Sequence, residues 1–455
     1  MMVTYLGRVS ESAGFSDIPH LSQNGVMDMV RRVILLTWVM WLMIGAAAYA
    51  AAPYVVQSEG VVALVDGDGV SILENADIDA LFAVRPGMLY AAGKVGNYQL
   101  YDARGNRLNE MPFAMIDDAG DALIFRQNGL CGAMDARGNI IVPAEWPQLV
   151  SNGEGGFLAL DGEGTLYYLG RNVSPAPLGL RLTGNLSAFS EGRMAYTDES
   201  GAYGCLDAAG NVAIPASFDW IGGFHDGASI AVSDKQYGLI DRFGDWIVPP
   251  RYRWMQRGDG FIAALTESGS LRLLSTDGKT LRHVRARATQ AAVVGEYAAL
   301  WDEKTAQLYD AKGRCVLEAA PDALFFPGEG GQIIVSEGRW DAPEQYLMKS
   351  DGSVQEGRYP RIAPLLPGRY AFLTMQGVEY YSELLDSLQI SWNYSTARWG
   401  LMDSRGATLL PAEYLEIRAV GEDRLILRTG DTLIFTDQDG NPLRTWPLTP
   451  TRTNS

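Results

Sequence analysis

The stretch YGLIDRFGDWIVPPRY, residues 237 to 252, recurs along this chain in closely related forms. The related segments are YGCLDAAGNVAIPASF at 203–218, WGLMDSRGATLLPAEY at 399–414 and CGAMDARGNIIVPAEW at 131–146. In all four, an aromatic residue or Cys lies four residues before an Asp, and Gly lies three before it. Gly, Pro and an aromatic residue follow that Asp at three, eight and eleven residues. A phrase kept with such spacing predicts a repeating structural unit.

The aspartates of these segments follow one period. Asp207 and Asp241 are 34 residues apart, and Asp135 lies 72 residues before Asp207, which is two steps of 36. A regular period of this size predicts one array of about eleven units of ~35 residues, not a set of separate domains. Besides the four strong units, weaker ones centre on Asp66, Asp102, Gly170, Ser275, Asp310, Lys349 and Asp437.

Each unit is expected to contain a β-hairpin. Leu239-Ile240 reads as a short apolar strand, and 241–244 reads as a type I turn with a bulge. The aspartate of this turn is expected to accept hydrogen bonds from the backbone N–H groups two and three residues further on, and Gly244 to take the left-handed conformation. Pro249 is expected to end the return strand, because proline cannot donate to a ladder.

Two other positions of the unit predict close packing. Gly238 has no side chain, which lets a neighbouring unit approach closely. The aromatic residue three positions after the proline is expected to fold back over the hairpin and pack between units. The residues at this position are Trp146, Phe218, Tyr252 and Tyr414.

The units predict an all-β fold of three or four short antiparallel strands each, because no helical periodicity lies between them. Short antiparallel units at regular spacing are typical of propeller blades. Eleven units exceed the usual single ring, so one ring, two rings in tandem and an open superhelical arc all remain open. We expect one continuous propeller-like array.

The pattern F-x-x-G-x-A-x-V, followed by [WY]-G-x-[IM]-D-x-x-G-x-x-[IV]-P-x-x-[FY], resembles the WG (or KWG) repeat family of bacterial proteins. Trp399-Gly400 has the eponymous pair, whereas Cys131-Gly132 departs from it. The resemblance runs in register over about 53–450 and implies a β-rich repeat protein, often exported, with no catalytic residues to transfer. The signature residues are Tyr203, Gly204, Asp207, Gly210, Pro215, Tyr237, Gly238, Asp241, Gly244, Pro249, Trp399, Gly400, Asp403, Gly406 and Pro411.

The N-terminal residues predict export. Residues 31–52 read RRVILLTWVMWLMIGAAAYAAA, which has the charged start, apolar centre and A-x-A end of a signal peptide, with cleavage before Ala51. The alternative is a single transmembrane anchor formed by one apolar helix, Val33 to Ala52, which leaves the repeats outside. Residues 1–30 form a polar extension, and a start at Met27 or Met29 would turn the remainder into an ordinary signal peptide.

Composition excludes some partners. The chain of 455 residues is 47% hydrophobic, so it can bury a large core, and its net charge of −17 argues against a nucleic-acid partner. The three cysteines, Cys131, Cys205 and Cys315, form no CxxC motif and are interpreted as small core residues.

One insertion interrupts the period. The step from Lys349 to Asp403 is 54 residues long, and the extra residues lie at about 375–397. Within them, Val378 to Ile390 has the spacing of an amphipathic helix. This helix either caps the array or binds a partner, in which case the contact residues would be Tyr380, Tyr381, Trp392 and Tyr394.

The chemistry expected of the chain is binding without catalysis. The repeated aspartates sit where turns need them, and VDGDG and TDQDGN lack the ligand set of a calcium loop, so neither a metal nor a cofactor is predicted. His225 and His283 are expected to be exposed, without a partner nucleophile. Trp246, Trp254, Trp301 and Trp340 are candidate platforms for sugars.

The sequence therefore predicts an exported, non-catalytic scaffold that binds protein partners at the bacterial cell envelope, either anchored in the membrane or secreted. A protein that binds cell-wall glycans through exposed Trp and Tyr is the first alternative. An envelope hydrolase with carboxylates in a central channel is the second.

Overall fold

The computed structural model describes residues 53–58, 61–74, 78–170, 174–339, 342–382 and 387–448. The chain divides into two compact units, Met1–Ala51 and Ala52–Ser455, and only the second contains described residues. The predicted extension at 1–30, the signal or anchor helix at 31–52 and Trp340 lie outside the described residues. No helix within the described ranges has the length and apolar character needed to cross a membrane.

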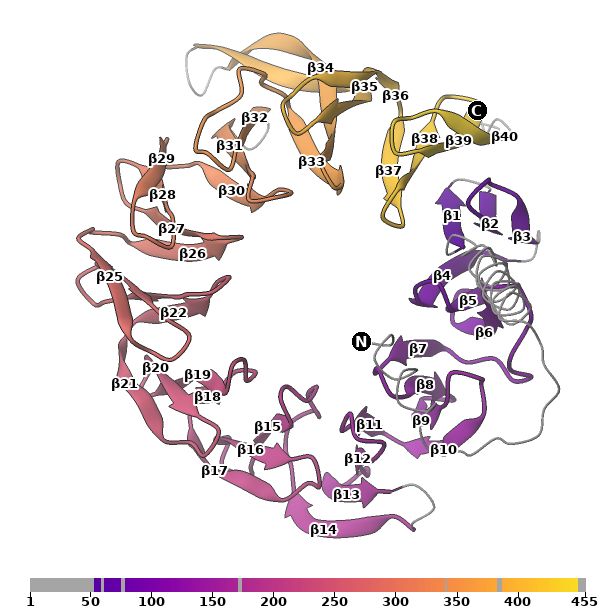
Figure 1. Ribbon diagram of the computed structural model, residues 1–455, viewed down its shortest axis with the longest axis vertical. Helices are drawn as coiled ribbons and strands as arrows, with labels where there is room; N and C mark the ends of the chain where they lie inside the picture. The colour runs from indigo at the N-terminus through magenta and orange to yellow at the C-terminus, as the bar shows by residue number, and fades with distance from the viewer. Residues whose placement is uncertain are drawn as a thin grey trace, which may run out of the picture. The chain divides into compact units, whose positions relative to one another are not determined.

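The described residues of the second unit form eleven antiparallel sheets, which we call blades 1 to 11 in chain order (Figure 1). Each blade is built from consecutive strands, as expected for a meander. Blades 1 to 5 are β1 (Tyr54–Ser58), β2 (Val61–Val65), β3 (Ser71–Glu74); β4 (Ala80–Arg85), β5 (Leu89–Lys94), β6 (Asn97–Asp102); β7 (Met115–Asp118), β8 (Leu123–Gln127), β9 (Leu130–Met134), β10 (Ile140–Trp146); β11 (Gln148–Ser151), β12 (Phe157–Leu160), β13 (Thr165–Leu169), β14 (Ala176–Arg181); and β15 (Arg193–Thr197), β16 (Tyr203–Asp207), β17 (Val212–Phe218).

The remaining blades continue the same order. Blades 6 to 11 are β18 (Trp220–Ile221), β19 (Ala228–Ser233), β20 (Gln236–Asp241), β21 (Trp246–Tyr252); β22 (Trp254–Arg257), β23 (Ile262–Leu265), β24 (Leu271–Leu274), β25 (Thr280–Val284); β26 (Gln290–Val294), β27 (Tyr297–Trp301), β28 (Ala306–Tyr309), β29 (Cys315–Ala319); β30 (Leu324–Pro327), β31 (Ile333–Arg339), β32 (Ala342–Met348); β33 (Arg361–Leu366), β34 (Arg369–Ser382), β35 (Ser387–Asp403), β36 (Thr408–Tyr414); and β37 (Glu416–Val420), β38 (Arg424–Arg428), β39 (Thr432–Asp437), β40 (Pro442–Pro447).

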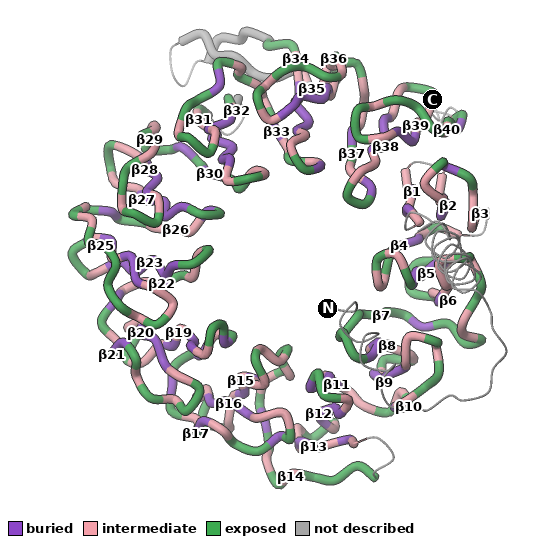
Figure 2. The backbone as a smooth tube through the Cα atoms, viewed as in Figure 1, coloured by how far each residue is buried: buried purple, intermediate pink, exposed green. Residues whose placement is uncertain are grey.

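The central strands of each blade have apolar residues at adjacent positions because both faces of the blade are buried (Figure 2). Leu239 and Ile240 are both fully buried although they point to opposite faces of β20. Leu239 packs in a cluster shared by blades 6 and 7, and Ile240 packs in one shared by blades 5 and 6. A strand buried on both faces needs a continuous apolar run, not an alternating one.

The eleven blades close into a single ring, an eleven-bladed propeller arrangement. The described residues form eleven buried apolar clusters, and each cluster joins two neighbouring blades. One of them joins blade 11 to blade 1 through Phe435, Trp446 and Val56. In Figure 1, β37 accordingly lies beside β1. The tandem rings and the open arc, which the sequence left open, are therefore not what this chain forms.

Several side-chain hydrogen bonds also cross this closing seam. Arg444 donates from Nη1 to the Gly69 carbonyl at 2.7 Å and from Nη2 to Glu74 Oε2 at 3.1 Å, and Arg418 donates to the Gln57 carbonyl. Within the described ranges no strand of blade 11 pairs with a strand of blade 1, so the ring is closed by side-chain packing and hydrogen bonds, not by a shared blade.

The prediction for the repeated turn is confirmed, with one correction. Gly244 N–H donates to the Asp241 carbonyl at 3.2 Å, and Gly244 has φ +91°. Oδ1 of Asp241 accepts from the backbone N–H groups of Phe243 at 2.8 Å and Asp245 at 3.0 Å, which are two and four residues further on. We predicted two and three. The second donor is the residue after the left-handed Gly, one position later than predicted. The bulge adds one residue to the turn, and this residue is then the one that pairs across it.

Two predictions about the return strand are wrong. Pro249 does not end β21, since pairing resumes beyond it at Tyr252, opposite Tyr237. The prolines instead occupy a bulge, where no ladder N–H is needed. Gly238 makes room within its own blade and not for a neighbour: an added Cβ would lie 2.5 Å from the Val248 carbonyl oxygen and 2.5 Å from the Trp246 ring.

The packing role of the aromatic residue after the proline is confirmed. Tyr252 is 4% exposed and lies in the cluster between blades 6 and 7. Phe218 is buried between blades 5 and 6. Trp146 and Tyr414 are half-buried against the clusters that join blades 3 to 4 and blades 10 to 11.

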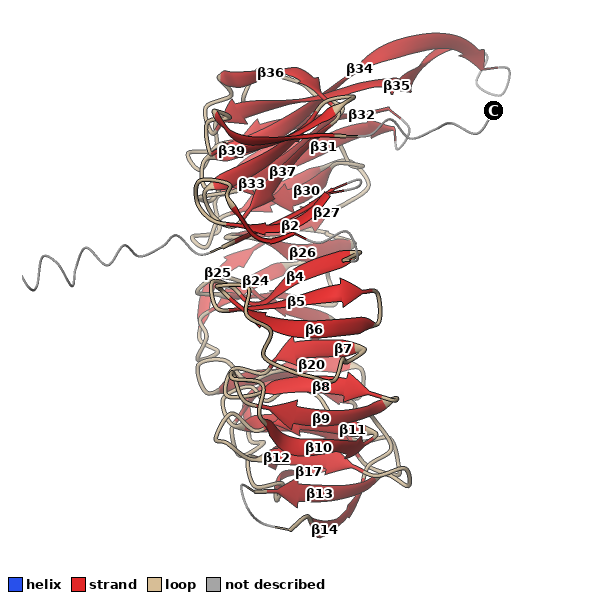
Figure 3. Ribbon diagram, turned by 90° about the vertical axis from the view of Figure 1, so that its right-hand side faces the viewer, coloured by secondary structure: helices blue, strands red, loops and turns tan. Residues whose placement is uncertain are grey.

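The helix predicted over Val378 to Ile390 is wrong. These residues belong to β34 and β35, which pair with each other as far as Ser382 opposite Ser387. Figure 3 shows this hairpin reaching beyond the other strands of the unit. The strand conformation of these residues is set by pairing. Each strand continues a ladder that starts inside blade 10, and this pairing outweighs the weak helical spacing of the sequence. The side chains of Tyr380, Tyr381, Trp392 and Tyr394 lie outside the described residues.

The cysteine interpretation holds for two of the three residues. Cys131 and Cys205 are buried in the clusters between blades 3 and 4 and between blades 5 and 6, whereas Cys315 is exposed at the start of β29. The last strand of a blade lies at its outer edge in Figure 1, so its residues have fewer neighbours. His225 and His283 are exposed, as predicted.

Candidate functional site

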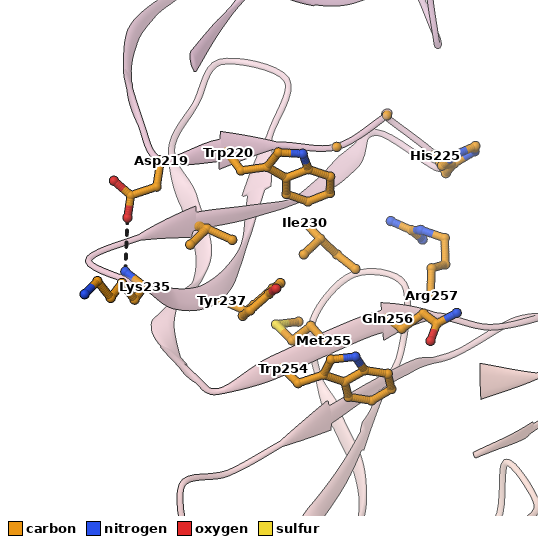
Figure 4. Close-up of a pocket in the computed structure, with 13 residues that line it drawn as sticks. Asp219, Trp220, His225, Ile230, Lys235, Tyr237, Trp254, Met255, Gln256 and Arg257 are labelled. Carbon is orange, nitrogen blue, oxygen red and sulfur yellow. Dashed lines mark hydrogen bonds between the residues drawn. The ribbon is translucent and has the colours of Figure 1, made fainter. Parts of the chain in front are cut away.

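A groove of about 870 Å³ opens between blades 6 and 7. It is lined by the short first strand β18 with the loop that follows it, by β19 and β20, and by β22 of the next blade (Figure 4). β18 is only two residues long because Gly222-Gly223 follows it directly. A concave surface lined by apolar side chains with a few convergent polar groups is the usual form of a small-molecule site.

Two tryptophans flank the groove. Trp220 and Trp254 both lie five residues after the repeat proline, Pro215 and Pro249, so they occupy equivalent positions in consecutive blades. Trp220 is 43% exposed, and Trp254 is half-buried against the core shared by blades 7 and 8. In Figure 4, Ile230, Tyr237 and Met255 lie between the two indoles.

Gly222 explains why the Trp220 indole lies along its own strand. A Cβ at position 222 would be 2.8 Å from Cη2 of Trp220 and would displace the ring. The indole therefore lies over a residue without a side chain. The ring presents apolar surface to the groove and packs against the backbone of Gly222.

One end of the groove holds Asp219 and Lys235 (Figure 4). Oδ2 of Asp219 accepts from the backbone N–H of Lys235 at 3.0 Å. Asp234 and Lys235 have φ +51° and +62°, which are the values of a type I′ turn, and blade 3 has Asn128-Gly129 in the corresponding turn. A lysine in place of that glycine is strained. Its ammonium group makes no ion pair with any residue that the structure describes.

Arg257, Gln256 and His225 occupy the other end. The Arg257 side chain is 19% exposed, and its Nη2 donates to the Ala228 carbonyl at 3.1 Å. Nη1 is buried and has no hydrogen-bond partner among the described residues; it lies 4.0 Å from Oδ2 of Asp226. Burial lowers the pKa of Arg257, although the charges of Asp226 and Glu191 raise it. A buried guanidinium nitrogen without an acceptor favours an incoming anion or polar oxygen.

Most other polar groups at the groove are also donors. Oε1 of Gln256 accepts from the Val293 N–H at 3.0 Å, which leaves its amide NH₂ for the groove. Within the described ranges, neither indole N–H of Trp220 or Trp254 donates to another residue. Asp219 is the one carboxylate among the described residues that line the groove.

A family model described as "WG containing repeat" matches residues 203–235 and 237–257, which are the two repeats that contain most of this groove. The chain carries WG repeats. Among curated proteins, no sequence matches the chain.

Solved structures show a weak likeness to this WG-repeat chain. A eukaryotic initiation factor matches with 11% identity over 68% of this chain and 96% of its own, at a TM-score of 0.40. BamB from Moraxella catarrhalis matches with 16% identity over 60% and 92%, at 0.26. AztD from Citrobacter koseri matches with 11% identity over 60% and 95%, at 0.30. Scores this low carry no argument about function.

The WG-repeat signature residues are structural and not part of the groove, except Tyr237. The repeat aspartates are used by their turns. Burial alone would raise the pKa of Asp207, but hydrogen bonds from the Asn211 side chain and from two backbone N–H groups hold it below its ordinary value. No group of three or more potential metal-ligating side chains occurs in the described part of the chain.

The sequence identified part of the groove. Trp254 was a candidate platform, and it does line the groove. Trp246 instead packs edge-on against Phe218 at 5.5 Å, and Trp301 donates its N–H to the Ala323 carbonyl at 2.7 Å inside the core. Sequence reasoning missed Trp220, Lys235 and Arg257. A signal for Trp220 was present, because two of the other three strong repeats have the polar residues Gln148 and Glu416 at its position and only the third has a tryptophan, Trp254.

Proposed function

We propose that this protein is exported and works at the bacterial cell envelope as a non-catalytic binding module, with the groove between blades 6 and 7 as its ligand site. The observation that carries the proposal is the groove itself, in which two tryptophans and unpaired donors converge on a rigid ring. The apolar run after Arg31-Arg32 and the A-x-A sequence before Ala51 support export.

Between the two binding functions predicted from the sequence, the groove favours the glycan binder over the protein scaffold. Indole faces with hydrogen-bond donors beside them suit sugar rings, whose C–H faces stack while their oxygens accept. Binding without catalysis is supported by the repeat aspartates, since their oxygens accept hydrogen bonds within turns. A hydrolase would need carboxylates that are free to exchange protons with a substrate.

The experiment is fractionation of the native cells followed by mass spectrometry of the N-terminus of the full-length gene product. A chain that begins at Ala51 outside the cytoplasm, or one that retains Val33–Ala52 in the membrane with the repeats outside, supports the proposal. A cytoplasmic chain that keeps its apolar segment in a soluble fraction would overturn the envelope function. Co-sedimentation of the exported form with purified cell wall then tests the glycan class, and no pelleting at micromolar protein counts against it.

A further inference from the structure

We infer that the groove between blades 6 and 7 binds an oligosaccharide that carries carboxylate groups, with sugar rings against Trp220 and Trp254 and carboxylates at Arg257 and Lys235. This inference rests on the proposed binding function and names its ligand class. Four observations support it: the spacing of the indoles, the excess of donors, the basic ends of the groove and their contrast with the charge of the whole chain.

The two indoles suit a ligand with repeated flat apolar faces. Trp220 and Trp254 hold equivalent repeat positions one blade apart: Trp220 lies on the blade 6 side of the groove, and Trp254 lies on the blade 7 side, where it also packs against the core shared by blades 7 and 8. A linear sugar chain offers a C–H face on successive residues and can therefore contact both indoles at once. Gly222 keeps the Trp220 indole on its strand, so this platform exists before any ligand arrives.

The hydrogen-bonding groups of the groove are mostly donors. The Gln256 amide, the two indole N–H groups, Lys235 and Nη1 of Arg257 all donate, while Asp219 alone contributes a carboxylate. A peptide backbone presents donors and acceptors in equal number and would leave its N–H groups without acceptors here. A carboxylated sugar chain presents mainly acceptor oxygens, and its hydroxyl groups adapt to either role.

Each end of the groove has a cation that makes no close ion pair within the described ranges. Lys235 has no ion pair among the described residues, and it is held in a left-handed conformation by the bond from its N–H to Asp219. Arg257 pairs only loosely, at 4.0 Å, with an aspartate that is itself 70% exposed. Guanidinium and ammonium groups recognise carboxylates, so both cations can bind the acid groups of such a ligand.

The positive charges of Lys235 and Arg257 are opposite in sign to the net charge of the chain. The chain has a formal net charge of −17, which repels anions from its surface as a whole. Binding of an anionic glycan therefore requires local compensation, and the groove provides it. We expect affinity to fall as salt screens the two cations.

The test is isothermal titration calorimetry of the exported full chain with tetragalacturonic acid and with a hyaluronan tetrasaccharide, each compared with its methyl ester. We expect at least one acid to bind at least tenfold more tightly than its neutral ester, and pentaglutamate not to bind. No binding of either acid would overturn the inference, as would equal binding of acid and ester. Binding of pentaglutamate as tight as that of the sugars would replace the glycan by an acidic peptide.

Variants locate the site. Trp220→Ala and Arg257→Gln should each weaken binding of the acid at least tenfold, and only Arg257→Gln should abolish the preference over the ester. Phe243→Ala, which removes an exposed aromatic residue outside the groove, and Arg137→Gln, which removes an exposed cation, are matched controls and should change nothing. Full affinity in both groove variants would place the ligand elsewhere and overturn the inference.

A footprinting measurement needs no variant. Tetragalacturonic acid should protect Trp220 of the unaltered chain from hydroxyl-radical oxidation and leave Phe243 unprotected. Protection of Phe243 alone would contradict the inference. These results are independent of the fractionation experiment, so an envelope protein that fails to bind acidic sugars would keep its proposed location and lose only this ligand.

Discussion

The hydroxyl of Tyr54, in blade 1, donates a hydrogen bond of 2.8 Å to Oδ1 of Asp423, in blade 11. The guanidinium of Arg424 lies 5.3 Å from the centre of the same tyrosine ring. Residues that are 369 positions apart in the sequence therefore meet in the buried seam that closes the ring.

This contact predicts a loss of stability in alkaline solution. Burial, followed by the hydrogen bond to Asp423, raises the pKa of Tyr54 from 10.0 to about 12. A raised folded-state pKa means that its stabilisation is complete below pH 10 and is lost as the pH rises from 10 to 12. The protection of β1 and β37 from hydrogen exchange, relative to the intrinsic exchange rate at each pH, should fall in this window.

The control is Tyr54→Phe. At neutral pH this variant should lose about 1 kcal/mol at the seam, the net value of one hydrogen bond. It should also show a weaker response of the seam to alkaline pH. If β1 and β37 of the variant respond to alkali as strongly as in the unaltered chain, Tyr54 is not the titrating group.

Gly238→Ala should destabilise the protein by about 2–3 kcal/mol, because the new Cβ would meet the Val248 carbonyl oxygen at 2.5 Å and overpack the blade. Gly430→Ala is the matched control, since no described atom lies within 4 Å of a Cβ added there. Urea denaturation followed by circular dichroism measures both. Equal midpoints for the two variants would show that β21 moves aside freely.

The repeat aspartates predict acid sensitivity. Burial alone would raise the pKa of several of them, but hydrogen bonds within the turn hold it below the ordinary value of 3.8. A lowered folded-state pKa means that this stabilisation is present above about pH 4 and is lost as the pH falls through the folded-state value. The aspartates concerned are Asp102, Asp135, Asp207, Asp310, Asp403 and Asp437.

Two substitutions at Asp207 separate its charge from its acceptor role. Asp207→Ala should cost about 1 kcal/mol because two backbone N–H groups lose their acceptor. Asp207→Asn should keep the turn and flatten the acid response. Asp259→Asn, at an exposed site that accepts no hydrogen bond from described residues, should match the unaltered chain in thermal melts across the acid range. If the stability of the Asp207→Asn variant falls as steeply in acid as that of the unaltered chain, the prediction is contradicted.

The cysteines should differ in reactivity. Cys315 is exposed, whereas Cys131 and Cys205 are buried, and burial raises the pKa of Cys205 to about 11. Maleimide should label one thiol of the native chain near neutral pH and all three after unfolding in guanidinium. Peptide mass spectrometry identifies the site, and native labelling of Cys205 would show that blades 5 and 6 separate readily.

The β34–β35 arm should be removable without loss of the ring. The ladder from Arg369 opposite Asp403 to Thr374 opposite Arg398 lies within blade 10, and a register shift after Thr374 marks where the arm begins. Replacing 376–396 by a two-residue Asn-Gly turn, which keeps Met375 opposite Ala397, should leave the melting temperature and the affinity for acidic sugars unchanged. If the arm binds a protein partner through Tyr380, Tyr381, Trp392 or Tyr394, only the recovery of that partner in cross-linking from cells should fall.

The sequence alone determined the repeat, the β class and the turn chemistry of this protein. These are local properties. An Asp that accepts hydrogen bonds from the N–H groups of its own turn and a Gly with positive φ both depend only on residues of the same five-residue turn. The roles of Asp241 and Gly244 could therefore be predicted before the tertiary structure was known. The sequence also placed Tyr252 between units, because a large aromatic residue at a fixed repeat position needs a fixed partner.

Tertiary structure decided everything that depends on distant pairing. Val378 to Ile390 has a helical spacing, but the strands of blade 10 extend into it. Gly238 faces its own blade's bulge because Pro249 does not stop β21. Ring closure at Tyr54 and Asp423 and the convergence of Trp220 with Arg257 depend on how much each blade rotates relative to the previous one. That rotation is set by the packing of whole blade faces, and no short stretch of sequence encodes it.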